Sequence, residues 1–426
     1  MKLPNTISAL HQSLSSNKLV YAEVVAQQQD QFNTLGAQFN AITHHLPVTH
    51  ERGFEKERPL SGAALAHKDI FDLKDRTPGL GRDFGKLSAG TSPAPAVEVL
   101  SNAGAINLGA LAMAEDACAA TGQTTSIPTP INPLGKHLAV GGSSSGSAVA
   151  VASGMVYGAL GTDTAGSVRI PAMTCGVMGL KTTHGLISTE GVTPLSPSLD
   201  SVGVLARSVQ DLTSLFEVLA NDRPTAASVD PLNLRTAFWL ENISLDADIG
   251  QTIEPVLTRY GQAAIDLSEH EYRATALQQL IMVNETGQIH HDRITAGQAC
   301  RQVVDLGIVG LATPRHWFDE ALRIRSFCTQ AFVEHAFAQA DVLVLPLQVA
   351  SLPGTDEVYF GGEHFEPKKL LALHRYCGWL NYLGLPALAM PVGVDADGLP
   401  VSIQLVAKPF HEHHLLALGQ KIQHDL

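Results

Sequence analysis

The chain has 426 residues and a formal net charge of −13, from 28 Lys and Arg against 41 Asp and Glu. This acidic balance argues against nucleic-acid binding, because it offers no basic surface for phosphates. With 45% hydrophobic and only 16% charged residues, the composition is that of a folded chain with a large core, which excludes disorder. Of the 37 glycines, 21 fall between residues 61 and 210, so this third of the chain is rich in turns.

The first part of the chain predicts a helical arm followed by an α/β core. Apolar residues recur at helical spacing over residues 6–33, which indicates two surface helices. From about 61 to 210, strand-like runs alternate with helical segments, such as a helix over 96–103 before a strand at 105–108. We therefore expect an N-terminal arm at residues 1–60 that packs on a catalytic domain at 61–426, with the core motif block at 61–210.

The second part of the chain adds further helices and strands without a linker. Residues 274–283 have a helical pattern, and 341–347 (DVLVLPL) read as a buried strand. Residues 387–394 and 399–406 are strand candidates joined by Asp395-Ala-Asp-Gly398, a plausible hairpin turn. Because no repeat or low-complexity segment divides the chain, we predict a single large α/β domain with a mixed β-sheet covered by helices on both faces.

Targeting and metal signals are absent from the sequence. The N-terminus has no apolar signal-peptide region, so we expect a cytoplasmic protein. The uncharged stretch 138–162 is long enough to span a bilayer but holds five serines and six glycines, and we interpret it as a buried loop plus a helix. Five widely spaced cysteines without a CxxC pair suit buried free thiols in a reducing compartment. His411, His413 and His414 lack matching ligands elsewhere, so we predict neither a metal nor a cofactor.

A lysine lies inside the apolar segment 62–71 (GAALAHKDIF). In an extended chain, Lys68 shares a face with Ala64 and Ala66, among small apolar groups. Desolvation would lower its pKa toward neutrality and make it a candidate general base. The alternative is a lysine on an edge strand whose ammonium group reaches water.

A glycine- and serine-rich turn at 141–147 (GGSSSGS) precedes an Ala/Val helix. Its backbone N–H groups and hydroxyls would converge on one small space suited to an anion or an oxyanion. Three interpretations stay open here: a phosphate site, a nucleophile elbow with Ser144 at the centre of GSSSG, and part of a serine-rich hydrolytic site.

A second turn of this kind occurs at 161–171 (GTDTAGSVRIP). Asp163 and Arg169 could hold this loop from inside by charge-assisted hydrogen bonds, so that Ser167 is presented rigidly. The N–H groups of residues 164–167 could then stabilise an oxyanion.

Together these segments resemble the amidase signature family of serine amidases. The resemblance spans Gly62 to about Arg207 and includes GGSSSGSAVAVASG, GTDTAGSVRIPA, CGVMGLKTTHG and SLDSVGVLARS, with weaker agreement over residues 381–406. It implies the amidase signature fold and an enzyme that cleaves carbon–nitrogen bonds of linear amides.

The resemblance also assigns roles. Lys68 matches the family base, Ser143 the bridging serine that follows a cis peptide, and Ser167 the nucleophile. The implied oxyanion donors are the N–H groups of Thr164, Ala165, Gly166 and Ser167, and the implied supporting residues are Ser144, Asp163 and Arg169. Proton transfer would run between Lys68, Ser143 and Ser167 without a histidine or a metal.

From this we expect an amidase that hydrolyses an amide bond of a small substrate through a serine acyl-enzyme and releases ammonia or an amine. One alternative is an A-subunit-like glutaminase component of an amidotransferase complex, and another is an α/β-hydrolase esterase that uses Ser144. The stretch 109–115 (GALAMAE) lacks the Lys-Thr-Asn run common in the family, which disfavours the amidotransferase alternative, and Ala165 replaces a usual glycine. The expected partner is a small-molecule amide, with no nucleic acid and no membrane, and a homodimer is a further option. Substrate choice would lie in the segments 82–87, 118–125 and 290–375.

Overall fold

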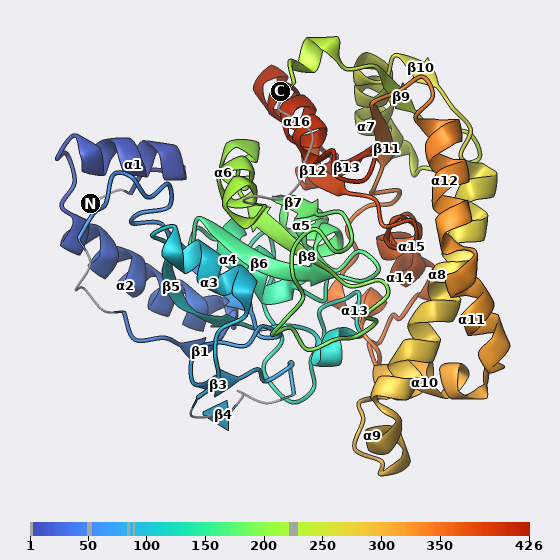
Figure 1. The fold of residues 1–426 in the computed structure, drawn as a ribbon, viewed down its shortest axis with the longest axis horizontal. Coiled ribbons are helices and arrows are strands. Elements are labelled where there is room, and N and C mark those ends of the chain that lie inside the picture. Colours follow the sequence, from blue (N-terminus) through green and yellow to red (C-terminus); the bar gives the residue numbers. More distant parts are fainter. Residues whose placement is uncertain (1–2, 49–52, 83–85, 88–89, 221–228) are drawn as a thin grey trace.

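One mixed β-sheet of eleven strands runs through the described part of the chain (Figure 1). The computed structural model describes residues 3–48, 53–82, 86–87, 90–220 and 229–426. In sheet order the strands are β1 (Ile42–His45), β5 (Ile106–Leu111), β2 (Ala64–Lys68), β6 (Gly158–Asp163), β8 (Ser201–Ala206), β7 (Met178–Lys181), β12 (Ala387–Val394), β13 (Pro400–Ala407), β11 (Val342–Pro346), β9 (Thr236–Phe238) and β10 (Ala263–Ala264). A separate pair is formed by β3 (Arg76–Thr77) and β4 (Lys86–Leu87).

The sheet places the predicted lysine strand at an interior position. β2 pairs in parallel with β5 on one side and β6 on the other, while β6, β8, β7, β12, β13 and β11 continue as antiparallel neighbours. All five residues of β2 are buried, as is usual for a strand with parallel neighbours and both faces covered. The alternative of an edge-strand lysine is therefore wrong.

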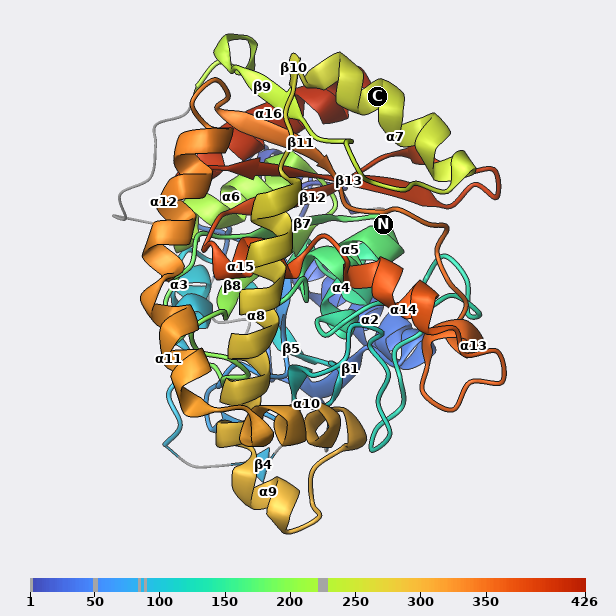
Figure 2. The ribbon, with the colours of Figure 1, turned by 90° about the vertical axis from the view of Figure 1, so that its right-hand side faces the viewer.

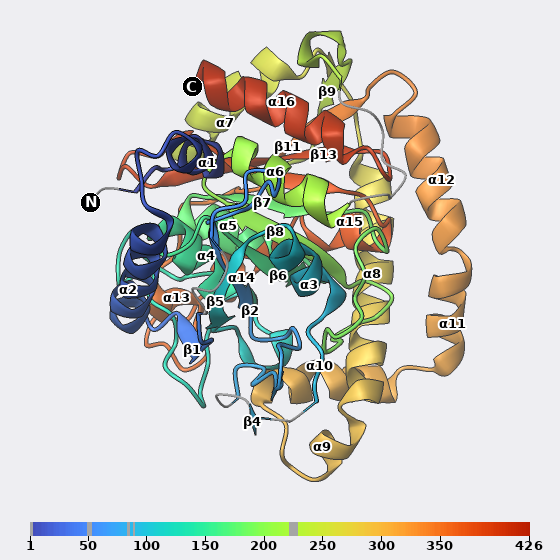
Figure 3. The same ribbon diagram turned by 60° about the vertical axis from the view of Figure 1, so that its left-hand side comes forward.

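Helices cover both faces of the sheet, as the sequence predicts. Residues of α1, α3, α6, α7 and α16 share one apolar cluster with the strands, and residues of α2, α4 and α5 share another. Figure 3 shows α3, α6 and α16 in front of the sheet. These helices are α1 (Ile7–Ser15), α2 (Tyr21–Phe39), α3 (Pro95–Asn102), α4 (Ser145–Ala152), α5 (Arg169–Cys175), α6 (Val209–Leu219), α7 (Ala247–Tyr260) and α16 (Glu412–Asp425).

A third group of helices lies beside the sheet rather than on it. Figure 2 shows α11 and α12 end to end alongside α8, with α10 crossing near one end of α8. Apolar residues of α8, α11 and α12 pack with α15 and with residues of β11, β12 and β13 in a separate cluster. The remaining helices are α8 (Ser268–Ile289), α9 (His291–Thr295), α10 (Arg301–Ala312), α11 (Arg315–Arg323), α12 (Arg325–Ala336), α13 (Thr355–Val358), α14 (Pro367–His374) and α15 (Gly378–Tyr382), and 3₁₀ turns occur at Glu115–Ala117 and Pro231–Asn233. The buried residues of α13 and α14 pack in the cluster of α2, α4 and α5.

Most local predictions agree with these elements. The two N-terminal helices, the helix and strand near residue 100, the buried strand near 341 and the C-terminal hairpin are all present, and Gly398 in the hairpin turn has φ +77°. Residues 138–162 form a loop, α4 and β6, and none of the described helices is long and apolar enough to cross a membrane. The proposed boundary at residue 60 stays a prediction.

The cysteine expectation needs one refinement. All five are free, and Cys175, Cys328 and Cys377 are buried, but Cys118 and Cys300 are only half-buried.

No group of three or more His, Cys, Asp or Glu side chains within the described ranges is placed to hold a metal ion.

The middle of the sheet should carry much of the stability. Leu405 on β13 is fully buried, and replacing it with alanine should lower the free energy of unfolding by about 2–5 kcal/mol, because the cavity cannot fully collapse. Chemical denaturation measures this. Leu232, which is 73% exposed, is the control, and Leu232→Ala should change stability by less than about 0.5 kcal/mol. Equal effects of the two variants would contradict the assigned core.

Candidate active site

Lys68 ends β2 in a fully buried position between two hydroxyl groups. Its Nζ lies 2.7 Å from Oγ of Ser143 and 2.7 Å from Oγ1 of Thr162, and the side chain is 1% exposed. Burial lowers the pKa of Lys68 to about 7, while the Asp200 and Asp163 carboxylates act in the opposite direction. A lysine in this state exchanges a proton with a neighbouring hydroxyl near neutral pH.

The Gly142–Ser143 peptide is cis, and the turn around it is tightly packed. A Cβ atom on Gly142 would lie 2.4 Å from the carbonyl oxygen of Ala119, so this position requires glycine. The Gly142 N–H donates to the Ala120 carbonyl at 2.7 Å, and the Ser143 carbonyl accepts from Ala114 N–H at 3.1 Å. These contacts hold the Ser143 hydroxyl against Lys68.

Ser144 faces the interior of the protein. It is fully buried at the start of α4, and its hydroxyl donates to the Thr162 carbonyl at 3.3 Å. No strand precedes it, since residues 135–140 form turns and irregular chain. The nucleophile-elbow hypothesis requires an exposed hydroxyl at the end of a strand, so this geometry argues against Ser144 as a nucleophile.

Ser167 lies in the turn between β6 and α5 and is half-buried. Its carbonyl accepts from the Ser144 N–H at 3.1 Å, which joins the two serine-rich turns. The residue also lines a cavity of about 250 Å³ with Thr164, Ala165, Cys118 and Thr121. Lys68 and Ser143 therefore meet directly, and Ser167 sits on the adjoining turn at the edge of the cavity.

Asp163 and Arg169 form the buried ion pair that shapes this turn. Arg169 Nη2 and Nε donate to the Asp163 carboxylate at 3.0 and 3.1 Å, and neither side chain is exposed. Arg169 also donates to the side chains of Asn381 and Gln404, so it ties the turn to α15 and β13. Burial by itself would raise the pKa of Asp163, but Arg169 more than offsets this and holds it well below its usual range.

The structure changes the expected set of oxyanion donors. The Gly166 N–H donates to the Asp163 carboxylate at 2.9 Å, so it is not available to a substrate. The Asp163 carboxylate also accepts from the Val168 N–H, so the backbone of the turn is wrapped around this carboxylate. Among the described hydrogen bonds, the N–H groups of Thr164, Ala165 and Ser167 have no acceptor within the protein.

Sequence reasoning missed three polar contributors to the site. Thr162 contacts Lys68, and Asn381 donates to both the carbonyl and the carboxylate of Asp163. Asp200 accepts from the Thr164 hydroxyl at 2.6 Å and from two backbone N–H groups, and burial raises its pKa to about 6. Each lies within a motif that carries the family resemblance, so the motifs contained a signal but gave no pairing.

Two of the three segments expected to select the substrate line the cavity. Cys118 and Thr121 come from the segment 118–125, and Leu306, Phe360 and His374 come from the segment 290–375. Met282 on α8 also lines it and was not expected. The segment 82–87 lies partly outside the described residues.

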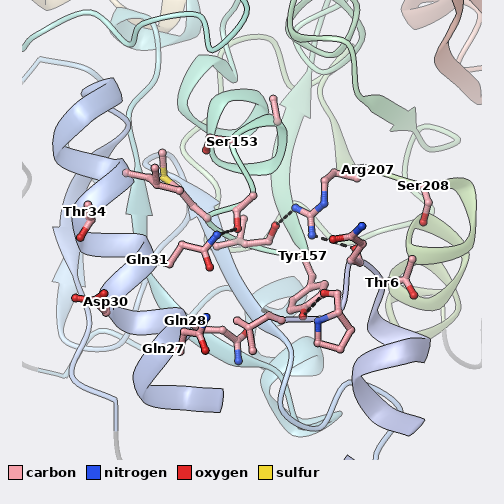
Figure 4. A pocket seen from close by; sticks show the side chains of 18 residues that line it. Thr6, Gln27, Gln28, Asp30, Gln31, Thr34, Ser153, Tyr157, Arg207 and Ser208 are labelled. Carbon is pink, nitrogen blue, oxygen red and sulfur yellow. Dashed lines mark hydrogen bonds between the residues drawn. The ribbon is translucent and has the colours of Figure 1, made fainter. Parts of the chain in front are cut away.

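A larger cavity of about 1,100 Å³ lies elsewhere, between the N-terminal helices and the segments around residues 153–157 and 207–208 (Figure 4). Arg207 in its lining donates to the carbonyls of Val151 and Val156 and to that of Asn5 at 3.3 Å, and the Tyr157 hydroxyl donates to the Pro4 carbonyl. These groups serve to join the N-terminal segment to the body of the protein.

Comparison with known families identifies the class of protein to which this fold belongs. A model of the family described as Amidase matches residues 23–254 and 247–416. The chain belongs to the amidase family, the amidase signature enzymes that act on carbon–nitrogen bonds.

Known proteins add detail at two levels. By sequence, the chain is 30% identical to the A subunit of the glutamyl-tRNA(Gln) amidotransferase of Lachnospira eligens, over 86% of this chain and 88% of the relative. By structure, it matches a chain from the inhibitor-bound form of a vestigial protein complex that is connected with the evolutionary origins of an s-triazine catabolic enzyme. The match has 25% identity and a TM-score of 0.85, and it covers 99% of this chain and 98% of the other. The structure of the corresponding amidotransferase component from Thermotoga maritima, at 23% identity, covers 95% and 94% with a TM-score of 0.73 and supports the fold alone.

The buried ion pair yields a stability prediction. Arg169→Leu leaves the Asp163 carboxylate without its counter-ion and should lower the free energy of unfolding by about 3–5 kcal/mol in chemical denaturation. The matched control is Arg315→Leu, which removes an exposed i,i+4 pair with Asp319 and should cost less than about 0.5 kcal/mol. If the two variants unfold alike, Arg169 does not have the structural role assigned to it.

Proposed function

We propose that the chain hydrolyses an amide through a serine acyl-enzyme, with Ser167 as nucleophile, Ser143 as proton bridge and Lys68 as general base. The observation that carries the proposal is the buried contact of Lys68 Nζ with Ser143 Oγ at 2.7 Å, next to the turn that presents Ser167. Neutral Lys68 accepts a proton from Ser143, which accepts one from Ser167 as its oxygen attacks the carbonyl carbon.

The rest of the cycle follows from the same groups. The N–H groups of Thr164, Ala165 and Ser167 are the candidate donors to the tetrahedral oxyanion, a contribution of about 3 kcal/mol per well-placed donor. The proton held by Lys68 passes back through Ser143 to the leaving nitrogen, and ammonia or an amine departs. Water then attacks the ester by the same proton path and regenerates Ser167.

Two settings suit this chemistry. The chain could act alone on a small amide, or it could supply ammonia as the A-subunit-like component of an amidotransferase. The relative from Lachnospira eligens is named as such an amidotransferase component, and this supports the second setting more strongly than the first. If the second setting is right, the purified chain should hydrolyse amides only weakly and gain activity with its partner proteins.

Substitution of the proposed nucleophile tests the chemistry. Ser167→Ala should lower kcat/KM for amide hydrolysis by at least about 1,000-fold while the circular dichroism spectrum stays unchanged, because the acyl-enzyme cannot form. Ser144→Ala is the comparison variant, because the one hydrogen bond described for its buried hydroxyl is to the Thr162 carbonyl at 3.3 Å, and it should keep far more activity than Ser167→Ala. Loss of activity in the comparison variant alone would support Ser144 and refute Ser167.

The pH dependence tests Lys68. The neutral amine is the active base and its pKa is about 7, so kcat/KM should rise with pH and reach half its plateau near pH 7, rather than above pH 10 as for a lysine with the usual value of 10.5. The Asp200 carboxylate stabilises the charged amine, so Asp200→Asn should move the midpoint to lower pH. A flat profile between pH 6 and 9, or a shift to higher pH in the variant, would count against this assignment.

A further inference from the structure

The cavity beside Ser167 is small and mainly apolar. Its volume of about 250 Å³ is below the usual range for ligand pockets, which indicates a small substrate. Its apolar walls come from six helices and loops that lie apart in the sequence. The residues are Ile170, Leu195, Met282, Leu306, Phe360 and Leu370.

The charges around the cavity are unfavourable for an anion. No lysine or arginine lines it within the described residues, and its one acidic group is Asp305 on α10. Arg301 forms an ion pair with Asp305 at 3.3 Å and lies over the Phe360 ring, 6.0 Å from its centroid, but it is 75% exposed and sits outside the lining. Arg293, whose charge acts on the lining residue Cys118, is already paired with Asp116 at 2.9 Å. A carboxylate in the cavity would therefore lose hydration without gaining a lysine or arginine of the lining as its counter-ion.

His374 adds a hydrogen-bond acceptor to this wall. Its Nδ1 lies 2.9 Å from the carbonyl oxygen of Leu370, and because a carbonyl only accepts, Nδ1 carries the hydrogen. Nε2 is then an acceptor in the neutral ring, and burial lowers the pKa of His374, which keeps the ring neutral at pH 7. An acceptor here suits a substrate N–H or O–H and repels a carboxylate.

We propose that the cavity selects small, uncharged amides with an apolar chain or ring and discriminates against amides that carry a carboxylate, glutamine included. His374 Nε2 accepts a hydrogen bond from an N–H or O–H group of the bound substrate. This proposal rests on the serine amidase function proposed above and, of its two settings, on the one in which the chain acts alone on a small amide; a chain that releases ammonia from glutamine would overturn it. Gln302 in the same wall is neutral and can contribute a further hydrogen bond without changing this selectivity.

Matched substrate pairs test the selectivity. Hexanamide and adipamic acid share a six-carbon chain and differ by a terminal carboxylate, and phenylacetamide and 4-carboxyphenylacetamide differ in the same way. With ammonia release as the readout, kcat/KM should be at least about tenfold higher for the neutral member of each pair, and L-glutamine should be as poor as the acids. Equal or higher kcat/KM for the acids or for L-glutamine would overturn the proposal.

A designed charge tests whether the cavity wall is responsible. Leu306→Lys places an ammonium in the lining and should shift the neutral-to-acid ratio of kcat/KM toward the acid by at least about tenfold. Ile308→Lys adds the same charge to an exposed position of α10 outside the lining, where it should leave the ratio within about twofold. Equal shifts in the two variants would overturn the assignment of the wall.

The outcomes separate this inference from the proposed function. If every amide is hydrolysed no faster than by Ser167→Ala protein, the serine amidase function fails, and the inference fails with it. If hydrolysis depends on Ser167 but favours the carboxylated substrates, the function stands and the inference alone is refuted.

Discussion

The burial of one lysine is the constraint on which the site depends. Lys68 can be kept in the interior only if its amine has hydrogen-bond partners and little charge, and the two hydroxyls at 2.7 Å together with a pKa near 7 meet both needs. Its place on an interior strand excludes water from every side of the strand. The same dry surroundings that make a lysine costly in a folded core make it useful as a base.

A second buried charge organises the turn that carries Ser167. Asp163 accepts hydrogen bonds from the backbone of its own loop and from Arg169, and Arg169 in turn reaches residues of α15 and β13. This network joins the motif block near residue 165 to the C-terminal hairpin, more than 200 residues away. The segment 381–406, where the sequence agrees less closely with the family, thus contributes to the same site.

Local patterns predicted most of the fold, and the site was predictable only in part. The helices, the buried strands and the hairpin follow from spacing and turn residues, because these signals lie within short windows. The family resemblance pointed to Lys68, Ser143 and Ser167 as site residues. It could not show that the Gly166 N–H donates to Asp163 or that the Thr164 hydroxyl donates to Asp200, because both hydrogen bonds depend on the folded path of the chain. The cavity wall was least predictable, because Met282, Leu306 and His374 come from helices whose sequences show ordinary patterns.

The central claim, that Lys68 activates Ser167 through Ser143, is tested most directly by covalent labelling. A fluorophosphonate probe followed by peptide mass spectrometry should find one adduct, on Ser167, and labelling should become much slower in Lys68→Ala protein at the same pH. This result would connect the buried lysine to the reactivity of the serine on the adjoining turn. An adduct on Ser144, or labelling of Ser167 at an unchanged rate without Lys68, would contradict the account.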